Sequence, residues 1–561
     1  MHSLQTTDYL VFLVYFLVVA GYGYWVYARK QKASVSASHD YFLAEGSLTW
    51  WAIGASLIAS NISAEQFIGM SGNGFKMGLA ISTYEWMAAA TLMIVAIFFI
   101  PVYLKNKIYT MPQFLHQRYN STVAMIMAVF WLLLYVVVNL TSILYLGALA
   151  ISSISGLNLY LCMYGLAIFA IIITLGGMKV IGYTDVIQVF FLILGGLVTT
   201  YIALTMVADH YHTSGAINGL KMMMEKSDDH FHMIFKKDNA NFPSLPGLTV
   251  LIGGMWIVNL NYWGCNQYIT QRALGADIKT ARSGILFAAF LKLLMPIIVV
   301  LPGIAAYVLY QEGYFQNEMM VNGELVQDKA YPVLLNLLPV GLKGLSFAAL
   351  TAAIVASLAG KANSISTIFT LDIYKKKINT AASEQQLVKI GKLAIWVSML
   401  LACILSPFMG IDKKGGFEFI QEYTGFVSPG IFAMFILGFF WKKTSSNAAL
   451  FATIGGFGLS ILFKIMPLFV NLAFLEPFGF ATLVKQKTGE LLYEIPFLDR
   501  MGFVFLICTI GMYIISMVDY KRGVKSKGLE VDAAMFKASP SFMVGALLVF
   551  GILTALYTFF W

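Results

Sequence analysis

The amino-acid sequence predicts an all-helical protein that crosses a membrane about fourteen times. Of its 561 residues, 59% are hydrophobic and only 12% are charged, which departs strongly from the composition of soluble globular domains. Apolar runs of about 20 residues, the length needed to span a bilayer, follow one another along the chain. Basic residues beside apolar spans are expected on the cytoplasmic side, so the net charge of +9 indicates topology and no nucleic-acid partner.

The expected spans begin with a leading helix near residues 7–28, and the spans after it are numbered from 1. Spans 1 to 7 are expected near residues 48–72, 78–104, 121–152, 158–176, 184–207, 247–268 and 279–309. Spans 8 to 13 are expected near residues 337–374, 386–410, 417–441, 447–466, 500–518 and 540–560. Clusters of lysine and arginine fall in alternate loops, which predicts a multi-pass protein of the plasma (inner) membrane with both termini outside. The four cysteines fall in apolar runs and are expected to be packing residues.

The first span is interrupted by polar residues. The stretch ASLIASNISAEQFIGMSGNG, residues 55–74, carries Asn61, Ser63, Glu65 and Gln66 in its middle, with glycines close behind. A charged side chain at the bilayer centre costs about 2.5–3.5 kcal/mol on insertion scales, and broken backbone at that depth is tolerated only where it lines a cavity or is buried in protein. This stretch therefore predicts a binding site; a short re-entrant loop is the alternative.

A second interrupted span lies five spans further along the chain. The segment VLIGGMWIVNLNYWGCNQY, residues 250–268, combines glycines with Asn259, Asn261, Asn266 and Gln267. Two interrupted spans in corresponding positions of two halves indicate an inverted-repeat secondary transporter with its site near the middle of the membrane. We therefore expect the repeats at residues 48–207 and 247–442. Residues 1–47 would form the leading helix and first cytoplasmic loop, 208–246 an extracellular loop, and 443–561 peripheral helices.

Two ionisable residues stand alone in apolar runs, Glu85 in span 2 and Lys292 in span 7. Such residues inside a membrane indicate function by default, and the alternative is a structural ion pair between the two. Sugar hydroxyls need mixed donors and acceptors of this kind, because each hydroxyl buried without a partner costs about 1–3 kcal/mol. We therefore expect both residues to contact a neutral polyol.

Aromatic and amide residues accompany the second interruption. Tyr262 and Trp263 follow Asn259, and aromatic faces stack well on pyranose rings, although packing or an interfacial belt is the commoner role of such residues. The adjacent amides favour a functional role for Tyr262. Gln421 and Glu422 form a further polar pair at the start of span 10, where a plain helix end is the alternative.

Span 8 contains a lysine in an apolar setting. Ala353, Ser357 and Lys361 are spaced four residues apart and therefore share one face of the helix. Asp185, at the expected inner start of span 5, fits an N-terminal cap, because carboxylates stabilise helix N-termini. A role beside span 8 is the alternative for Asp185.

These motifs resemble the sodium/solute symporter family, and within it the bacterial members that carry galactose or glucose. The similar stretches occur in order along nearly the whole chain: ASLIASNISAEQFIGMSGNG, TYEWM, VNLTSILYLG, TDVIQVFFL, NQYITQR, the span 8 block up to TLDIY, and IQEYTGFVSPG. The resemblance implies a leucine-transporter-type core of five plus five helices, with helices 1 and 6 broken. It also implies alternating access to a central sugar site.

The resemblance implies a set of site residues. The sugar contacts would be Asn61, Gln66, Glu85, Asn259, Lys292, Gln421 and Tyr262. Tyr262 would also be the inner gate, stacked on the sugar ring and held near Asn139. Met70, Tyr84 and Phe417 would form the outer hydrophobic gate. One sugar-contact serine of the family is replaced here by Ala88, which bears on the choice of hexose.

The resemblance also implies one sodium site. The carbonyl groups of Ala59 and Ile62, together with Ala353 and Ser357 of span 8, would hold the ion through hard oxygen ligands. One of the family's two hydroxyls is missing, because Ala356 stands in its place. The positions that build a second sodium site in some members are Ala356, Ala359 and Gly360, so no second site is expected.

Lys361 lies one turn inward of Ser357. In the family, the aspartate at the position of Asp185 lies near the sodium exit route. We hypothesise that Lys361 pairs with Asp185 and either replaces sodium electrostatically or titrates as a proton-coupling group, because a desolvated lysine is readily deprotonated. The alternative is that Lys361 extends into the inner vestibule and sodium binds above it.

The sequence thus predicts a secondary active transporter whose partners are a hexose, sodium and the bilayer. A sugar-gated sensor or channel on the same fold is a second class. An enzyme would need a nucleophile with a base or a metal cluster, and all seven histidines fall outside the expected spans. The His-x-His pairs at 210–212 and 230–232 are weak metal candidates. Self-association is not predicted in either direction.

Overall fold

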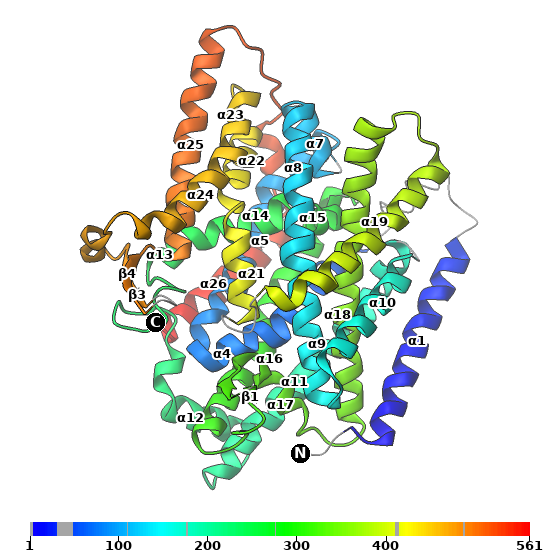
Figure 1. Ribbon diagram of the computed structural model, residues 1–561, viewed down its shortest axis with the longest axis vertical. Coiled ribbons are helices and arrows are strands. Elements are labelled where there is room, and N and C mark those ends of the chain that lie inside the picture. Colours follow the sequence, from blue (N-terminus) through cyan, green and yellow to red (C-terminus); the bar gives the residue numbers. More distant parts are fainter. Residues whose placement is uncertain are drawn as a thin grey trace. The chain divides into compact units, whose positions relative to one another are not determined.

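The structure is a computed structural model that describes residues 4–30, 49–108, 110–175, 178–274, 276–321, 323–409, 415–485 and 489–561 (Figure 1). The described chain is helical apart from loops and two short antiparallel hairpins, β1 (Met320–Val321) with β2 (Glu324–Leu325) and β3 (Thr482–Lys485) with β4 (Leu491–Glu494). The chain divides into two compact units. Unit 1 comprises Met1–Glu85, Leu132–His232 and Phe290–Ile420, and unit 2 comprises Trp86–Trp131, Met233–Ala289 and Gln421–Trp561.

The helices of unit 1 are α1 (Thr6–Lys30), α3 (Trp50–Asn61), α4 (Ser71–Met77), α9 (Thr141–Ser155), α10 (Leu159–Leu175), α11 (Met178–His210), α12 (Ala216–Lys226), α17 (Ala330–Leu335), α18 (Leu342–Thr367) and α19 (Glu384–Leu405). Its 3₁₀ and π-helical turns are η1 (Glu65–Met70), η2 (Gly78–Ser82), η4 (Leu134–Leu140), η5 (Asp228–Phe231), η6 (Gln327–Lys329), η7 (Ile368–Ile378) and η8 (Ser406–Phe408). Four helices have residues in both units: α5 (Thr83–Ile94), α8 (Ser121–Leu133), α16 (Ile278–Gln311) and α21 (Gly416–Gly425).

The helices of unit 2 are α6 (Ile100–Lys105), α7 (Met111–Arg118), α13 (Thr249–Ile252), α14 (Gly254–Cys265), α15 (Gln267–Leu274), α22 (Ser428–Phe440), α23 (Ser446–Leu450), α24 (Gly456–Ile465), α25 (Phe497–Lys521) and α26 (Pro540–Phe559). Its short turns are η3 (Val95–Phe99), η9 (Phe451–Gly455), η10 (Met466–Leu468), η11 (Ala473–Phe478) and η12 (Ala533–Phe536).

Nine of the described helices are long and apolar enough to cross a membrane, and up to 10 if the bent pair α21 and α22 is one span. Within the described residues, each range expected from the sequence consists mostly of helix. Several of them are shorter or interrupted, such as α10 with 17 residues and the separate pieces α13 and α14, and these do not count as long helices. The protein is thus an all-helical, multi-span membrane protein, and the finer number of about fourteen spans stays a prediction.

The most buried of the long helices in unit 1 is α18, which contacts α1, α3, α9, α10, α11 and α19 (Figure 1). In the apolar window of this helical stretch, 89% of the residues are buried. The segment LTAAIVASLAGKANS, residues 350–364, is rich in alanine, serine and glycine, and small residues let helices approach closely in a membrane. A helix enclosed in this way keeps the polar side chains of Ser357 and Lys361 away from lipid.

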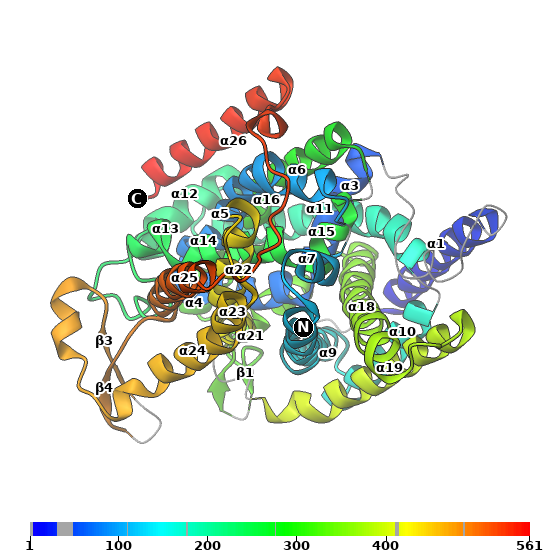
Figure 2. The same cartoon turned by 90° about the horizontal axis from the view of Figure 1, so that it is seen from above.

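In unit 2, α22 packs against α14 and α25 (Figure 2). The chain end of α22 is held by Arg118, the last residue of α7. Its guanidinium donates to the carbonyl oxygens of Gly438 at 2.7 Å, Trp441 at 2.9 Å and Thr444 at 3.1 Å. The last carbonyls of a helix have no partner within it, so this one side chain supplies donors to the end of α22 and to the turn after it. The carbonyl of Trp441 also accepts from Thr444.

Replacing Arg118 by methionine is expected to destabilise the protein by several kcal/mol. The side chain is 0% exposed, and each carbonyl left without a donor costs about 1–3 kcal/mol. Thermal unfolding of the purified protein in detergent measures the effect. The exposed Arg522, changed to methionine in the same way, is the matched control and should unfold like the parent. Equal unfolding temperatures for the two variants would contradict the role given to Arg118.

Two details expected from the sequence are corrected by the structure. Helix α11 begins at Met178, so Asp185 lies inside it and is not an N-terminal cap. The side chain of Asp185 lies outside the described residues. Span 10 is not one straight helix, because α21 and α22 meet at a bend of 52°. Pro429 stands in the first turn of α22, where proline suits a helix start, and this signal was present in the sequence.

The cysteines behave as expected. Cys162, Cys265, Cys403 and Cys508 are all free and buried. Among the described residues, no three histidine, cysteine, aspartate or glutamate side chains come together as metal ligands. His210 instead lies 3.1 Å from the carboxylate of Glu312, and His230 stacks on Tyr307 with 3.9 Å between ring centroids.

Candidate substrate and cation site

The break in the first interrupted span is closed by its own side chains. Helix α3 ends at Asn61, Ile62 is extended at φ −70° and ψ 115°, and η1 begins at Glu65. Ser63 Oγ accepts a hydrogen bond from the Glu65 amide at 3.1 Å, and the Ser63 amide donates to Gln66 Oε1 at 3.1 Å. These two side chains cap the break by satisfying the amides of Ser63 and Glu65, although the Gln66 amide donates to Ser63 O and not to Ser63 Oγ as it would in a full capping box.

The side-chain oxygen of Gln66 is used within the break, where it accepts the hydrogen bond from the Ser63 amide. We expected Gln66 as a sugar contact, but its amide oxygen is the acceptor for Ser63. The pattern Ser-x-x-Gln was visible in the sequence as a helix-start signal, and we did not use it. Any contact of Gln66 with a ligand would therefore go through its amide nitrogen.

The same cap frees two carbonyl groups from the helical ladder. In a continuous helix, the Ser63 amide would donate to Ala59 O and the Gln66 amide to Ile62 O. Here the Ser63 amide donates to the Gln66 side chain, and the Gln66 amide donates to Ser63 O at 3.2 Å. The carbonyls of Ala59 and Ile62 are the two that the family resemblance implies for a cation, and neither accepts the hydrogen bond that a continuous helix would give it.

Helix α18, which packs on α3 within unit 1, supplies the other expected cation ligands. Ala353, Ser357 and Lys361 lie on one uninterrupted helix, as predicted from their spacing. Ser357 is 1% exposed, and its hydroxyl has no hydrogen-bond partner within the described part of the chain. A buried hydroxyl with an unused oxygen suits a hard cation, so this chemistry fits the expected sodium ligand.

Lys361 forms a buried ion pair with Glu65. Its ammonium lies 3.3 Å from Glu65 Oε1, and the two residues are 4% and 8% exposed. Lys361 therefore does not extend into solvent, which was the alternative raised from the sequence. Its pairing with Asp185 stays a prediction, because the Asp185 side chain is not described. Sequence reasoning noted Glu65 as a polar residue of the broken span but did not give it this partner.

Lys292 joins three elements of unit 1. Its ammonium on α16 contacts the Glu85 carboxylate on α5 and the amide oxygen of Asn61 at the end of α3. Lys292 is 1% exposed, Glu85 3% and Asn61 9%. The ion pair suggested by the sequence is thus present, and the structure adds Asn61 as a third member. Three of the expected sugar contacts form one buried cluster of donors and acceptors.

The expected outer gate is assembled within unit 1. The rings of Tyr84 and Phe417 meet edge to face, with 4.9 Å between centroids. Gly69 packs so closely on Phe417 that a methyl group added to Gly69 would lie 2.8 Å from the Phe417 amide nitrogen. Met70 follows Gly69 and is 0% exposed. The three side chains expected to form the outer gate are therefore packed or buried here, and their role as a gate stays a prediction.

The remaining expected site residues belong to unit 2, except Asn139. Asn259 on α14 is 5% exposed, and its amide donates to Met255 O at 3.2 Å. Tyr262 is half-buried and meets Trp263 edge to face at 5.2 Å. Gln421 precedes Glu422, which is held by Lys464 at 3.0 Å and Arg500 at 3.4 Å. Glu422 is thus a structural anchor next to an expected contact.

Asn139 lies on η4 in unit 1 and is 8% exposed. Its expected proximity to Tyr262, and the convergence of the unit 2 residues on the cluster around Lys292, stay predictions.

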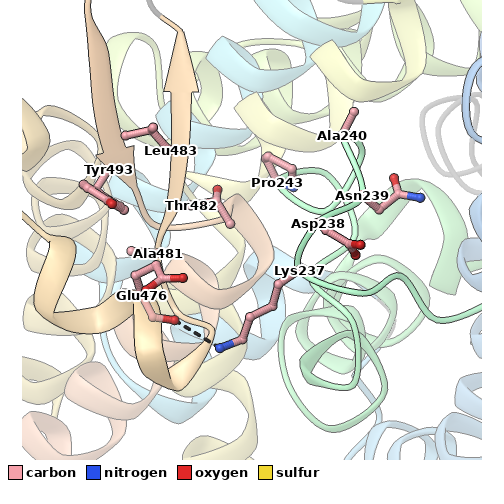
Figure 3. A pocket seen from close by; sticks show the side chains of 10 residues that line it. All are labelled: Lys237, Asp238, Asn239, Ala240, Pro243, Glu476, Ala481, Thr482, Leu483 and Tyr493. Carbon is pink, nitrogen blue, oxygen red and sulfur yellow. Dashed lines mark hydrogen bonds between the residues drawn. The ribbon is translucent and has the colours of Figure 1, made fainter.

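A pocket of about 310 Å³ lies elsewhere in unit 2, between the loop at 237–243 and the β3–β4 hairpin (Figure 3). Lys237 at its edge donates to Glu476 O at 3.1 Å and Pro477 O at 2.9 Å, which ties the two loops together. None of the expected sugar or cation residues lines this pocket. It is therefore separate from the candidate site.

Comparison with known proteins gives a consistent result. The sequence description of the "Sodium:solute symporter family" matches residues 41–456. The chain is 44% identical to the "Sodium/glucose cotransporter" of Vibrio parahaemolyticus, over 100% of this chain and 99% of that one. It is 32% identical to the human "Sodium/myo-inositol cotransporter 2", over 95% of this chain and 79% of that one.

Among solved structures, that of a Na+-coupled sialic acid symporter in a substrate-bound outward-open state is similar in fold. The TM-score is 0.71 at 21% identity, and the alignment covers 92% of this chain and 98% of the other. At this identity the likeness concerns the fold alone.

Proposed function

Because the chain belongs to the sodium:solute symporter family, we propose that it imports a hexose of the galactose or glucose type, driven by an inward sodium gradient with one sodium ion per cycle. Members of this family are transporters and not enzymes. The observation that carries the proposal is the 44% identity over the whole chain to a relative named a sodium/glucose cotransporter. The buried cluster of Lys292, Glu85 and Asn61 supports it, since the hydroxyls of a polyol need both hydrogen-bond donors and acceptors.

In this proposal the two interrupted helices form the site. Asn61, Glu85 and Lys292 would bind sugar hydroxyls together with the Gln66 amide nitrogen, Asn259 and Gln421, and Tyr262 would stack on the ring. The carbonyls of Ala59 and Ile62, with Ala353 and Ser357, would hold sodium beside it. Two repeats of five helices would then alternate between outward and inward access, and Tyr84, Phe417 and Met70 would close the outer side.

The choice of hexose is the open part of the specificity. Ala88 stands where a serine contacts sugar in the family, so one hydroxyl of the ligand loses a partner. Loss of a hydrogen bond to a buried polar group of the ligand costs about 1–3 kcal/mol, which is enough to change the preferred epimer.

Uptake into proteoliposomes tests the proposal. Galactose and glucose are expected to accumulate when sodium is outside, and accumulation should fall to background when choline replaces sodium. Myo-inositol is the informative competitor, because a relative 32% identical carries that name. Sugar-induced current without net accumulation would instead show a channel or sensor, and strict preference for inositol would overturn the hexose assignment.

A second candidate is favoured by one observation, the buried ion pair of Lys361 with Glu65. In this alternative the Lys361 ammonium stands where the cation would, and transport proceeds without sodium. Undiminished accumulation in choline would support it. Collapse of that accumulation by a proton ionophore would then indicate proton coupling.

A further inference from the structure

The short turn η6 lies against η1, the element that carries the expected gate residue Met70. It packs against η1, α4, α9 and α17. Its central residue, Asp328, is 1% exposed, and a methyl group added to Gly72 of α4 would lie 2.5 Å from Asp328 Oδ1. On the other side, the amide of Gly416, the first residue of α21, donates to Asp328 Oδ2 at 2.8 Å. The carboxyl group of Asp328 thus lies against α4 on one side and is hydrogen-bonded to the start of α21 on the other.

The carboxyl group of Asp328 is only half satisfied. Oδ2 accepts the hydrogen bond from Gly416, but Oδ1 has no partner within the described residues. A buried carboxylate oxygen without a donor is costly, whereas a protonated carboxyl group carries no net charge and needs less solvation. The environment therefore suits the protonated form.

The neighbouring contacts show where the charges lie. Lys76 of α4 pairs with Glu418 of α21 at 2.9 Å, and Gln327 of η6 donates to Asn73 of α4 at 3.3 Å. Lys329 turns away and donates to Met320 O at 3.3 Å.

Among the described elements packed against η6, η1 contributes Glu65, which pairs with Lys361, while α9 and α17 contain no charged residue. Within the described part of the chain, Lys76 and Glu418 are therefore the charged groups that act on Asp328, and their effects have opposite signs, with Glu418 the larger.

We propose that Asp328 is a proton-sensitive latch on the outer gate: with a proton on its carboxyl group, η6 holds α4 and the start of α21 together, and loss of that proton releases them. The latch consists of Asp328, Lys76 and Glu418. It rests on the proposed function only in that opening of this gate is taken as a step of transport. The latch itself is a property of unit 1.

The direction of the pH effect follows from linkage. The pKa of Asp328 is raised to about 7: burial is the main cause and the charge of Glu418 adds to it, while the Gly416 amide and Lys76 act in the opposite direction. An exposed aspartate has a pKa of about 3.9. Below about pH 4 both the closed and the released states are protonated, and the latch keeps its full stability. Between about pH 4 and 7 the ratio of released to closed molecules rises up to about tenfold per pH unit, and above pH 7 it stays level.

Accessibility of Asn73 tests the latch without any need for transport. Asn73 is 0% exposed beneath Gln327, and the four native cysteines are buried. In the full-length protein with Asn73→Cys, the rate of modification by a membrane-impermeant maleimide is measured from pH 5 to 8. The same measurement in Asn73→Cys with Asp328→Asn corrects for ionisation of the thiol itself. The ratio of the two rates should rise about tenfold per pH unit up to about pH 7 and then level off. A ratio that does not change with pH would overturn the proposal.

Two further variants keep the test decisive if Asp328→Asn folds poorly. Glu418→Gln removes a negative charge and should move the midpoint of the accessibility curve to lower pH, whereas Lys76→Met should move it to higher pH. Shifts in the same direction would contradict the latch.

Asp8→Asn is the matched control, because Asp8 is also a buried aspartate that accepts backbone hydrogen bonds, from Gly341 and Gly344 at the start of α18. It should leave the curve unchanged. If accessibility follows the expected curve while the protein takes up no sugar, the latch is supported and the proposed substrate is wrong.

Discussion

Replacing Lys292 by methionine is expected to abolish sugar uptake and to lower the free energy of unfolding by about 3–5 kcal/mol. The reason is that the change leaves the Glu85 carboxylate buried with no countercharge from Lys292, since the two residues are 1% and 3% exposed. Uptake per folded molecule and thermal unfolding in detergent are the two measurements. Uptake at the parental level would contradict the role of Lys292 as a sugar contact.

The double variant Lys292→Met with Glu85→Gln separates stability from binding. Removing both charges of a buried pair is often neutral for stability, so unfolding should return close to that of the parent. Uptake should stay abolished, because the sugar has lost its charged donor and acceptor. Lys343→Met is the control: Lys343 is another buried lysine of unit 1, at the start of α18 and outside the site, and its loss should not change substrate affinity.

The second large effect concerns the apparent affinity for sodium. Lys361→Met is expected to raise it about tenfold, because the Glu65 carboxylate then remains beside the cation site without its countercharge. Glu65→Gln should lower it by a similar factor, because the Lys361 ammonium then repels the ion. Uptake measured against sodium concentration gives both values.

The variant carrying both Lys361→Met and Glu65→Gln should return to the parental sodium affinity. This order, with the two single variants on opposite sides of the parent, is specific to an electrostatic role, since a packing defect would weaken all three. In the second candidate, the Lys361 ammonium takes the place of sodium and the parent protein transports sugar without sodium. Lys361→Met should then make uptake depend on sodium.

The fold and the break in the first span follow from the sequence because lipid imposes strong rules. A bilayer admits only long apolar helices, so their ranges were readable from hydropathy. Asn61 and Glu65 in such a helix had to face protein, and the structure buries both. The precise span number was not readable, because short and broken helices such as α13 leave no uniform length signal.

The partners of the charged residues were only half predictable. The ion pair of Glu85 with Lys292 was raised only as the alternative to sugar contacts, because each stood alone in an apolar run and a buried charge needs a partner; the structure contains this pair. We expected Lys361 to pair with Asp185 because both residues should lie at a similar depth in the membrane, and that pairing stays a prediction. The ion pair of Lys361 with Glu65, 296 residues away in the chain, was not expected. Spacing along a helix says which residues share a face, but it does not say which other helix that face meets.

Asp328 left no signal in the sequence at all. It lies in a loop that mixes both signs of charge, where an aspartate is ordinarily solvated. Its burial depends on how η6 folds over α4 and α21, which is set by packing between segments distant in the chain.

The hydrogen bonds of the Ser63 and Gln66 side chains at the break have a thermodynamic consequence. Because the side chains of Ser63 and Gln66 satisfy the amides of Ser63 and Glu65 at the break between α3 and η1, this backbone needs no sugar to hold its shape. A sugar would then bind to a preformed site, and binding would not be coupled to the folding of this segment. The heat-capacity change of binding, measured by calorimetry over a range of temperatures, should accordingly be small, on the scale of the surface of one monosaccharide.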